Sequence, residues 1–145
     1  MAKTYKTTGA IRFFNGLMKI MIRLGLAPKN MHILTVRGRA SGRRYSTPVS
    51  LIQEDSQRWL VAPYGEVSWV KNARAAGELT LTRGGKSETL TFTELGPEES
   101  APILKRYLQR EAITRPYFDV RPDSPLDDFV KEADRHPVFL LRDKA

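Results

Sequence analysis

The fold class is decided by residues 78–94, which read ELTLTRGGKSETLTFTE. Apolar and polar residues alternate on both sides of Gly84-Gly85, so every second side chain of each run points to the same face of a strand. Two glycines between two such runs are typical of the tight turn of a β-hairpin. This stretch therefore predicts two antiparallel strands, Glu78–Arg83 and Ser87–Glu94, each with one buried face.

Similar patterns extend outward from this hairpin in both directions. Runs rich in β-branched and other apolar residues predict four further strands, at His32–Arg37, Thr47–Gln53, Arg58–Ala62 and Pro137–Arg142. Apolar residues at helical spacing predict three helices, at Ile11–Leu24, Ser68–Ala76 and Pro97–Arg110. A proline-rich loop is expected at Arg115–Ser124. About six mostly antiparallel strands would close into a small barrel without exposed edges, so we predict one α+β, mainly β, domain over residues 1–145, with the helices outside the barrel.

Composition excludes several kinds of site. The chain has no cysteine, so disulfides, thiolate metal sites and cysteine nucleophiles are excluded. Its two histidines, His32 and His136, do not form a zinc-binding pattern, and no metal is expected. The apolar runs are too short to span a membrane, and the first residues lack the features of a secretory signal. We therefore expect a cytoplasmic protein.

Charge is distributed unevenly along the chain. Residues 1–53 contain ten basic residues and no acidic one, whereas the remainder contains fourteen basic and sixteen acidic residues, for a net charge of +8. Such a basic segment indicates an anionic partner: a phosphorylated small molecule, a membrane surface or a nucleic acid. Nucleic acid is disfavoured, because the segment lacks interleaved exposed aromatic residues and any recognised nucleic-acid-binding module. Solvated cations that bind no ligand are the alternative.

The densest basic cluster lies at residues 37–48, which read RGRASGRRYSTP. The two glycines allow the backbone to approach a ligand closely. Arg39, Arg43 and Arg44 add forked donors that suit phosphate or carboxylate, and neighbouring hydroxyls complete the set. The glycine spacing fits neither a P-loop nor a dinucleotide fingerprint. This cluster predicts an anion-binding turn, with a solvated basic hairpin as the alternative.

A second candidate segment is VAPYG at residues 61–65, where a strand ends in a loop before the helix that begins at Ser68. Trp69 and Asn72 lie three residues apart on that helix and therefore share a face, which would suit a flat heteroaromatic ligand. A tryptophan packed on the barrel is the alternative. The candidate proton donors are the tyrosines Tyr64, Tyr107 and Tyr117.

The predicted helix at Ile11–Leu24, within an N-terminal segment of residues 1–28, is amphipathic. Apolar residues occupy one face, and Arg12, Lys19 and Arg23 lie mainly on another. Packing of the apolar face on the protein's own core is favoured. The alternative is peripheral binding to an anionic membrane, because cations beside an apolar stripe also suit a bilayer surface.

Taken in order, these segments resemble the deazaflavin-dependent nitroreductase family, whose split β-barrel is related to the FMN-binding barrels of flavin reductases. The resemblance rests on LGLAP at residues 24–28, the Gly-Arg-x-Ser-Gly turn, the Val-Ala-x-x-Gly strand end, the Trp-x-x-Asn helix and HPVF at residues 136–139. It implies that the protein binds coenzyme F420 rather than flavin mononucleotide, and transfers a hydride to a nitroaromatic, quinone or activated enone. The alternative that it leaves open is a non-catalytic or divergent module of the same fold, which binds lipid or fatty acid at the membrane surface.

By position, the resemblance also implies a set of cofactor-binding residues. These are Arg39, Ser41, Gly42, Arg43, Arg44, Tyr45, Thr47, Pro48, Ala62, Pro63, Tyr64, Gly65, Ser68, Trp69 and Asn72. The turn residues would bind the phosphate and oligoglutamate tail of F420, and the others would surround its ring. Ala40 and Tyr45 stand where the family often has basic side chains, and Lys71 stands where it often has histidine. We expect a small-molecule acceptor as partner and a monomer or homodimer.

Overall fold

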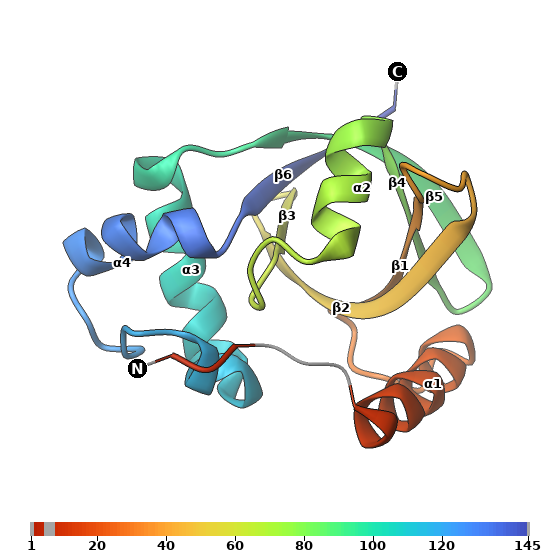
Figure 1. The fold of residues 1–145 in the computed structure, drawn as a ribbon, viewed down its shortest axis with the longest axis horizontal. Coiled ribbons are helices and arrows are strands. Elements are labelled where there is room, and N and C mark those ends of the chain that lie inside the picture. Colours follow the sequence, from red (N-terminus) through yellow and green to blue (C-terminus); the bar gives the residue numbers. More distant parts are fainter. Residues whose placement is uncertain (1, 5–7, 145) are drawn as a thin grey trace.

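The computed structural model describes residues 2–4 and 8–144 of the chain (Figure 1). The hairpin forms as predicted: strand β4 (Leu79–Arg83) pairs antiparallel with β5 (Lys86–Glu94). Gly84 and Gly85 occupy the turn with φ angles of 55° and 80°, which residues with a side chain rarely adopt. Alternate residues of this hairpin are buried in the barrel, so the period of two in the sequence indicates the inward face correctly.

The other strands complete a closed barrel, which confirms the predicted α+β, mainly β, class. They are β1 (Met31–Arg37), β2 (Arg44–Glu54), β3 (Gln57–Val61) and β6 (Val138–Asp143). Around the barrel the order is β1, β2, β3, β6, β5, β4, with every neighbouring pair antiparallel. The pairing of β1 with β4 closes the circle, so the barrel has six strands, as predicted.

Two apolar cores lie on opposite sides of the sheet. Leu60 and Phe139 belong to the core inside the barrel, whereas their neighbours Val61 and Val138 belong to an outer core. This change of side between adjacent residues follows from the pleat of a strand. The outer core lies between the barrel wall and the helices that follow β5. The helices are therefore part of the folded unit rather than appendages to it.

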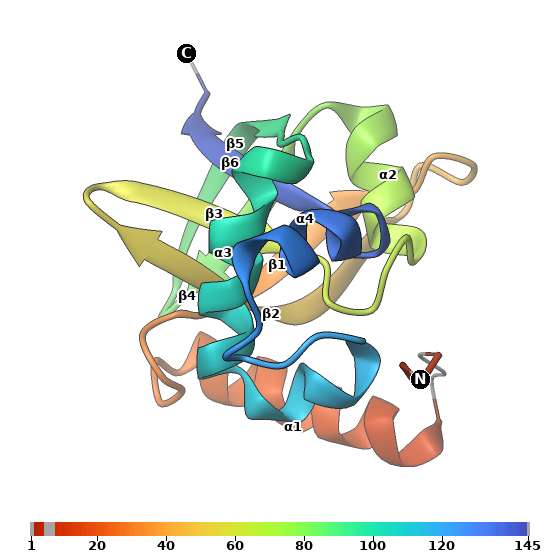
Figure 2. The ribbon, with the colours of Figure 1, turned by 90° about the vertical axis from the view of Figure 1, so that its left-hand side faces the viewer.

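Within residues 2–4 and 8–144, four α-helices and two short 3₁₀ helices lie outside the barrel (Figures 1 and 2). They are α1 (Gly9–Arg23), α2 (Ser68–Ala76), α3 (Pro97–Arg110), η1 (Ala112–Tyr117), α4 (Leu126–Glu132) and η2 (Ala133–Arg135). The bounds of α2 and α3 are those predicted. The predicted loop at Arg115–Ser124 begins within η1, and α4 and η2 were not predicted. Figure 1 shows α2 above the barrel and α3 with α4 at one side.

Helix α1 packs on the barrel through a small part of its surface. Ile22 is its one buried residue and contacts Ala27 and Ile33. Met18 and Met21 are partly buried against this cluster. Much of the other apolar surface is exposed: Phe13 is 76% exposed, and Phe14, Leu17, Ile20 and Leu24 are also exposed. The favoured packing of this face on the core is therefore met only near the C-terminal end of the helix. No helix in the described residues is long and apolar enough to cross a membrane.

Candidate functional site

The turn between β1 and β2 is compact and internally hydrogen-bonded. The backbone N–H of Gly38 donates to the Arg43 carbonyl at 2.6 Å, and that of Gly42 donates to the Gly38 carbonyl at 3.0 Å. Gly42 has a φ of 72°, and a Cβ at Gly38 would lie 2.6 Å from a ring carbon of Tyr45. Both glycines are thus required by the turn itself. Because these bonds extend the β1–β2 ladder to the turn, β2 begins at Arg44, three residues before the predicted start.

The three arginines of this turn are exposed and carry charge that no carboxylate neutralises. None of Arg39, Arg43 and Arg44 forms an ion pair with an acidic residue in the part of the chain that the structure describes. Such guanidinium groups keep their donors available for an anion. The geometry therefore agrees with an anion-binding turn.

Arg39 also connects the turn to α2. Its backbone N–H and its Nη1 both donate to Oδ1 of Asn72, at 3.0 and 2.7 Å. Asn72 is only 5% exposed, so its amide is fixed within the protein. The structure thus brings together two segments, 33 residues apart, that the sequence analysis assigned to one site.

The first half of β2 has one free side. The strand pairs with β3 only at Leu51–Glu54, whereas Arg44–Ser50 pair with β1 alone among the described residues. Pro48 lies in this half. On the side without a neighbouring strand, its missing N–H removes no hydrogen bond between strands. Thr47 and Pro48, both half-buried, therefore lie on a local sheet edge within the barrel wall.

The loop after β3 carries Tyr64, one of the three candidate proton donors. Ala62 and Pro63 are buried, and Gly65 has a φ of 87°. The ring of Tyr64 contacts that of Tyr117 edge to face, with 4.8 Å between the ring centres and 77° between the planes. Both tyrosines are half-buried, so each also has exposed surface. The structure thus pairs two of the three candidate proton donors.

Tyr107 and Trp69 have mainly packing roles. Tyr107 is 4% exposed in the outer core, and burial raises the pKa of its hydroxyl. This burial disfavours Tyr107 as a proton donor to an acceptor that binds from solvent. Trp69 is half-buried, and its ring centre lies 6.0 Å from that of Phe139 in the barrel core. Much of the Trp69 side chain is thus packed on the barrel, which was the alternative interpretation for this residue. Ser68, the residue before it, is exposed.

A cluster of titratable side chains lies at the α3–α4 end of the molecule and was not predicted; Glu132 and His136 are buried in it, and Arg135 and Asp119 are exposed. One oxygen of Glu132 accepts from the Asp119 backbone N–H at 3.0 Å and faces His136 Nε2 at 3.0 Å. The other oxygen accepts from Arg135 at 2.6 Å. Arg135 also donates to Asp119 and holds the pKa of that carboxyl below its usual range. The four-residue spacing of Glu132 and His136 is the one signal of this cluster in the sequence.

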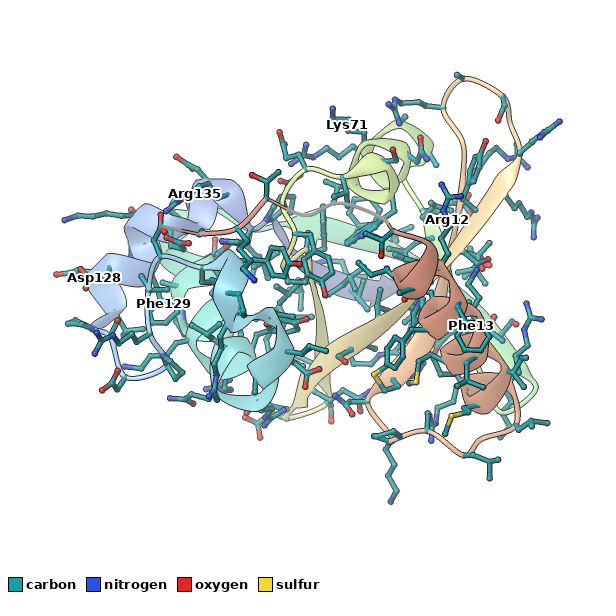
Figure 3. All side chains as sticks on the ribbon, turned by 60° about the horizontal axis from the view of Figure 1, so that its bottom comes forward. Arg12, Phe13, Lys71, Asp128, Phe129 and Arg135 are labelled. Atoms are coloured by element: carbon teal, nitrogen blue, oxygen red, sulfur yellow. The ribbon has the colours of Figure 1, made fainter. Side chains whose placement is uncertain are left out.

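Figure 3 places this cluster and α1 at different ends of the molecule: Arg135 and Phe129 lie at one end, and Arg12 and Phe13 lie at the other. Two surface hollows, of about 330 and 320 Å³, lie outside the predicted site. Glu66, Arg74 and Glu94 line the larger one, and there Arg74 pairs with both carboxylates. The smaller one lies at the turn between β2 and β3. Neither hollow is lined by a predicted cofactor-binding residue.

Comparison with known proteins identifies relatives of this chain. Residues 6–126, which include every strand except β6, match the model of the F420H(2)-dependent quinone reductase family. Solved structures that share the fold include the following three. An F420-H2-dependent reductase, FDR-A, is 22% identical, with 79% of this chain and 95% of that chain covered and a TM-score of 0.55. A protein described as a domain-swapped dimer is 18% identical, with 92% and 100% covered and a TM-score of 0.56.

The third solved structure is a protein of unknown function from Agrobacterium tumefaciens, 16% identical, with a TM-score of 0.60. The aligned region covers 99% of this chain but 60% of that longer one. No curated protein matches the sequence. Because the family model spans most of the chain, this deazaflavin-dependent reductase, with its split β-barrel, belongs to the F420H2-dependent quinone reductase family.

Proposed function

We propose that this protein binds reduced F420 through the β1–β2 turn and the N-terminal half of α2, and reduces a quinone, nitroaromatic or activated enone. The observation that carries the proposal is the position of Arg39. Its side chain is anchored on buried Asn72, while Arg43 and Arg44 beside it have no acidic partner in the described residues. This combination gives a fixed turn with free positive charge.

The residues of the turn fit the anionic part of the cofactor. F420 carries a phosphate and an oligoglutamate tail, which require several cationic donors on one exposed surface. Arg39, Arg43 and Arg44 supply them, and each guanidinium is suited to two-point contact with phosphate or carboxylate. The half-buried Ser46 and Thr47 follow on β2 and add hydroxyls. The donor set thus matches the tail by charge and by hydrogen-bonding type.

The ring of the cofactor requires a flat, water-poor surface with a few polar groups. The open edge of β2 at Thr47 and Pro48, the loop 62–65 and Trp69 are the segments that would surround it. When bound, reduced F420 supplies the hydride. The protein's own part is to orient the ring, exclude water and protonate the reduced acceptor. We assign the last role to the Oη of Tyr64 or Tyr117.

Anaerobic oxidation of reduced F420 tests this function. With the protein present, menadione or a nitroaromatic should oxidise reduced F420, and NADPH or reduced flavin mononucleotide should give little activity in the same assay. Fluorescence titration with oxidised F420 measures binding separately. If F420 binds and no acceptor in a broad panel is reduced, a ligand-carrier role replaces the enzyme. If long-chain fatty acids bind and F420 does not, the lipid-binding alternative is correct.

A second proposal concerns α1, whose exposed apolar face favours peripheral contact with an anionic membrane. Phe13, Phe14 and Leu17 are exposed, and Arg12 and Arg23 lie on the same short helix with no ion-pair partner in the described residues. An apolar stripe flanked by cations suits the boundary between headgroups and acyl chains.

Vesicles with and without anionic lipid test this contact. Binding should require the anionic lipid, weaken as salt rises, and be lost in a Phe13→Ser, Leu17→Ser double variant. The matched control is Ile113→Ser, which replaces an exposed apolar residue on η1. Equal behaviour of the double variant and the wild type on vesicles would exclude this role for α1.

A further inference from the structure

His136 lies between the two segments that carry the paired tyrosines. Its Nδ1 is 2.8 Å from the carbonyl oxygen of Pro63, the residue before Tyr64. Its ring stacks on Phe118, the residue after Tyr117, with 3.7 Å between the ring centres and 12° between the planes. One imidazole therefore contacts the immediate neighbours of both tyrosines.

The role of Nδ1 is fixed by its partner. A backbone carbonyl oxygen only accepts hydrogen bonds, so Nδ1 of His136 carries the hydrogen and donates it, whether or not the ring is charged. The ring is 3% exposed and has no freedom to turn toward water. The contact between His136 and Pro63 therefore links the end of η2, just before β6, to the loop 62–65.

Glu132 fixes the imidazole from the other side. Its carboxylate is 2% exposed and faces Nε2 of His136. The same oxygen accepts from the backbone N–H of Asp119, the residue after Phe118. Because Nδ1 donates to Pro63, Nε2 and Glu132 form a hydrogen bond when a proton lies between them, on the imidazolium or on the carboxyl group. With that proton in place Glu132 orients the ring, and it also anchors the chain just beyond η1. Such support of an active-site group by a second hydrogen-bonded residue holds rotamers in place.

Neighbouring contacts point the same way. Ala62 donates its N–H to the Pro137 carbonyl at 2.8 Å, and a Cβ at Gly65 would lie 3.3 Å from the Arg135 carbonyl. The loop that carries Tyr64 therefore rests on residues 135–137 along its length, with the His136 side chain at the centre.

We propose that His136 is a positioning residue for acceptor reduction: it holds Tyr64 and Tyr117 as a pair at the acceptor side of the site. This inference rests on the proposed function, because it assigns the tyrosines to the acceptor. The arginine turn, which would bind the tail of F420, contacts α2 rather than His136. Loss of the His136 contacts should therefore lower acceptor turnover more than F420 affinity. Loss of a positioning contact typically costs turnover because the reacting groups need close alignment.

Two substitutions separate the hydrogen bond from the bulk of the side chain. His136→Leu keeps volume but removes the donor, whereas His136→Asn keeps an amide N–H near the position of Nδ1. The Leu variant should raise the acceptor KM or lower kcat on the order of 10-fold, with a smaller loss of F420 affinity. The Asn variant should recover most of this loss. His32→Leu is the matched control, because His32 is also buried and bonded to a carbonyl, that of Asn30.

A measurement without turnover tests the placement itself. Incorporation of 3-fluorotyrosine labels the five tyrosines of the chain, and Tyr→Phe variants assign their ¹⁹F resonances. The Tyr64 and Tyr117 resonances should shift or broaden in His136→Leu and return in His136→Asn, while that of Tyr45 stays unchanged. His32→Leu should leave all of them in place.

Several results would overturn the inference. Unchanged Tyr64 and Tyr117 resonances in His136→Leu would show that His136 does not position them. A shifted pH profile of turnover in His136→Asn would make His136 an acid rather than a positioning residue. If His136→Leu fails to fold, His136→Asn is compared with the wild type. Large changes in both tyrosine resonances, although the Asn variant keeps a donor near Nδ1, would overturn the inference. If wild type neither binds nor oxidises reduced F420, the proposed function fails, and the fluorine spectra alone decide whether His136 positions the pair.

Discussion

Replacing Arg39 by alanine should affect both cofactor binding and stability, because this side chain has two partners in the proposal. One donor, Nη1, bonds to Asn72, and the remaining donors are available to an anion. Hydrogen bonds to charged groups contribute about 1.5–3 kcal/mol. Loss of one such contact to the F420 phosphate or tail should therefore raise Kd roughly 12- to 160-fold.

The cost in stability should be smaller. In the alanine variant the backbone N–H still donates to Oδ1 of Asn72, so the buried amide oxygen keeps a partner. The lost bond comes from a guanidinium that is exposed and remains solvated in the unfolded chain, so its loss costs about 1.5 kcal/mol, the lower end of the range for charged groups. For a chain of this size, about 1 kcal/mol lowers Tm by roughly 2–4 °C.

Arg43 and Arg44 are the matched controls. Neither has an ion-pair partner among the residues described, so Arg43→Ala and Arg44→Ala should weaken F420 binding without lowering Tm. Fluorescence titration at low and high salt and thermal unfolding of all four proteins give both quantities. Unchanged affinity in all three variants would refute the assignment of this turn. A loss of stability without loss of affinity in Arg39→Ala would leave Arg39 only its link to α2.

Three further predictions follow from packing and burial. Trp69→Ala should reduce acceptor turnover more than F420 affinity, because the indole ring lies beside the site while the arginine turn stays intact. Single-turnover kinetics and titration measure the two quantities, and a larger loss of affinity than of turnover would contradict this. Tyr64→Phe and Tyr117→Phe should lower kcat for at least one of the pair, whereas Tyr107→Phe, with its hydroxyl buried in the outer core, should not. Burial lowers the pKa of His32, so below about pH 6.5 the unfolded chain binds more protons than the folded one, and stability should fall as the pH falls. Thermal melts from pH 8 to 5 should show a shallower slope in His32→Gln, and an equal slope would refute this contribution.

The sequence predicted the barrel well because its information is local. The alternation in residues 78–94 and the two glycines at the turn specify both strands without reference to distant residues. The start of β2 was predicted too late, because Arg44, Tyr45 and Ser46 are polar and show no alternation. Their strand conformation comes from pairing with β1, for example Val36 with Tyr45, and a local pattern does not contain that pairing.

The α3–α4 region was predicted less well for a related reason. Pro116 and Pro122 suggested the loop at Arg115–Ser124, and no helix was predicted after it. Pro125 is the N-cap of α4, where proline's fixed φ and missing N–H are compatible with a helix start. The short helix then gains its stability from tertiary contacts, with Phe129 wholly buried in the outer core. Because this helix was missed, the cluster of Glu132 and His136 was missed with it.

The candidate site shows the same division between local and distant information. The arginine turn was visible in residues 37–48, but the contact of Arg39 with Asn72, 33 residues away, was not predicted. The family resemblance assigned the two segments to one site without that contact. The bond from His136 to Pro63 spans 73 residues and was not predicted either. Side chains that bind a ligand directly are thus recognisable by type and spacing, whereas those that position them depend on the completed fold.

Helix α1 has an apolar face that its own barrel covers only in part. Its periodicity indicates that an apolar face exists, and the structure leaves most of that face in contact with solvent. Burial of a large apolar side chain is worth about 1.5–3 kcal/mol relative to exposure, so coverage of Phe13, Phe14 and Leu17 by another surface would be strongly favourable. The basic residues beside them disfavour a cationic or weakly polar protein partner and favour an anionic surface. The amphipathic pattern of α1 therefore predicts that another surface covers its apolar face, and the basic residues beside that face favour an anionic surface.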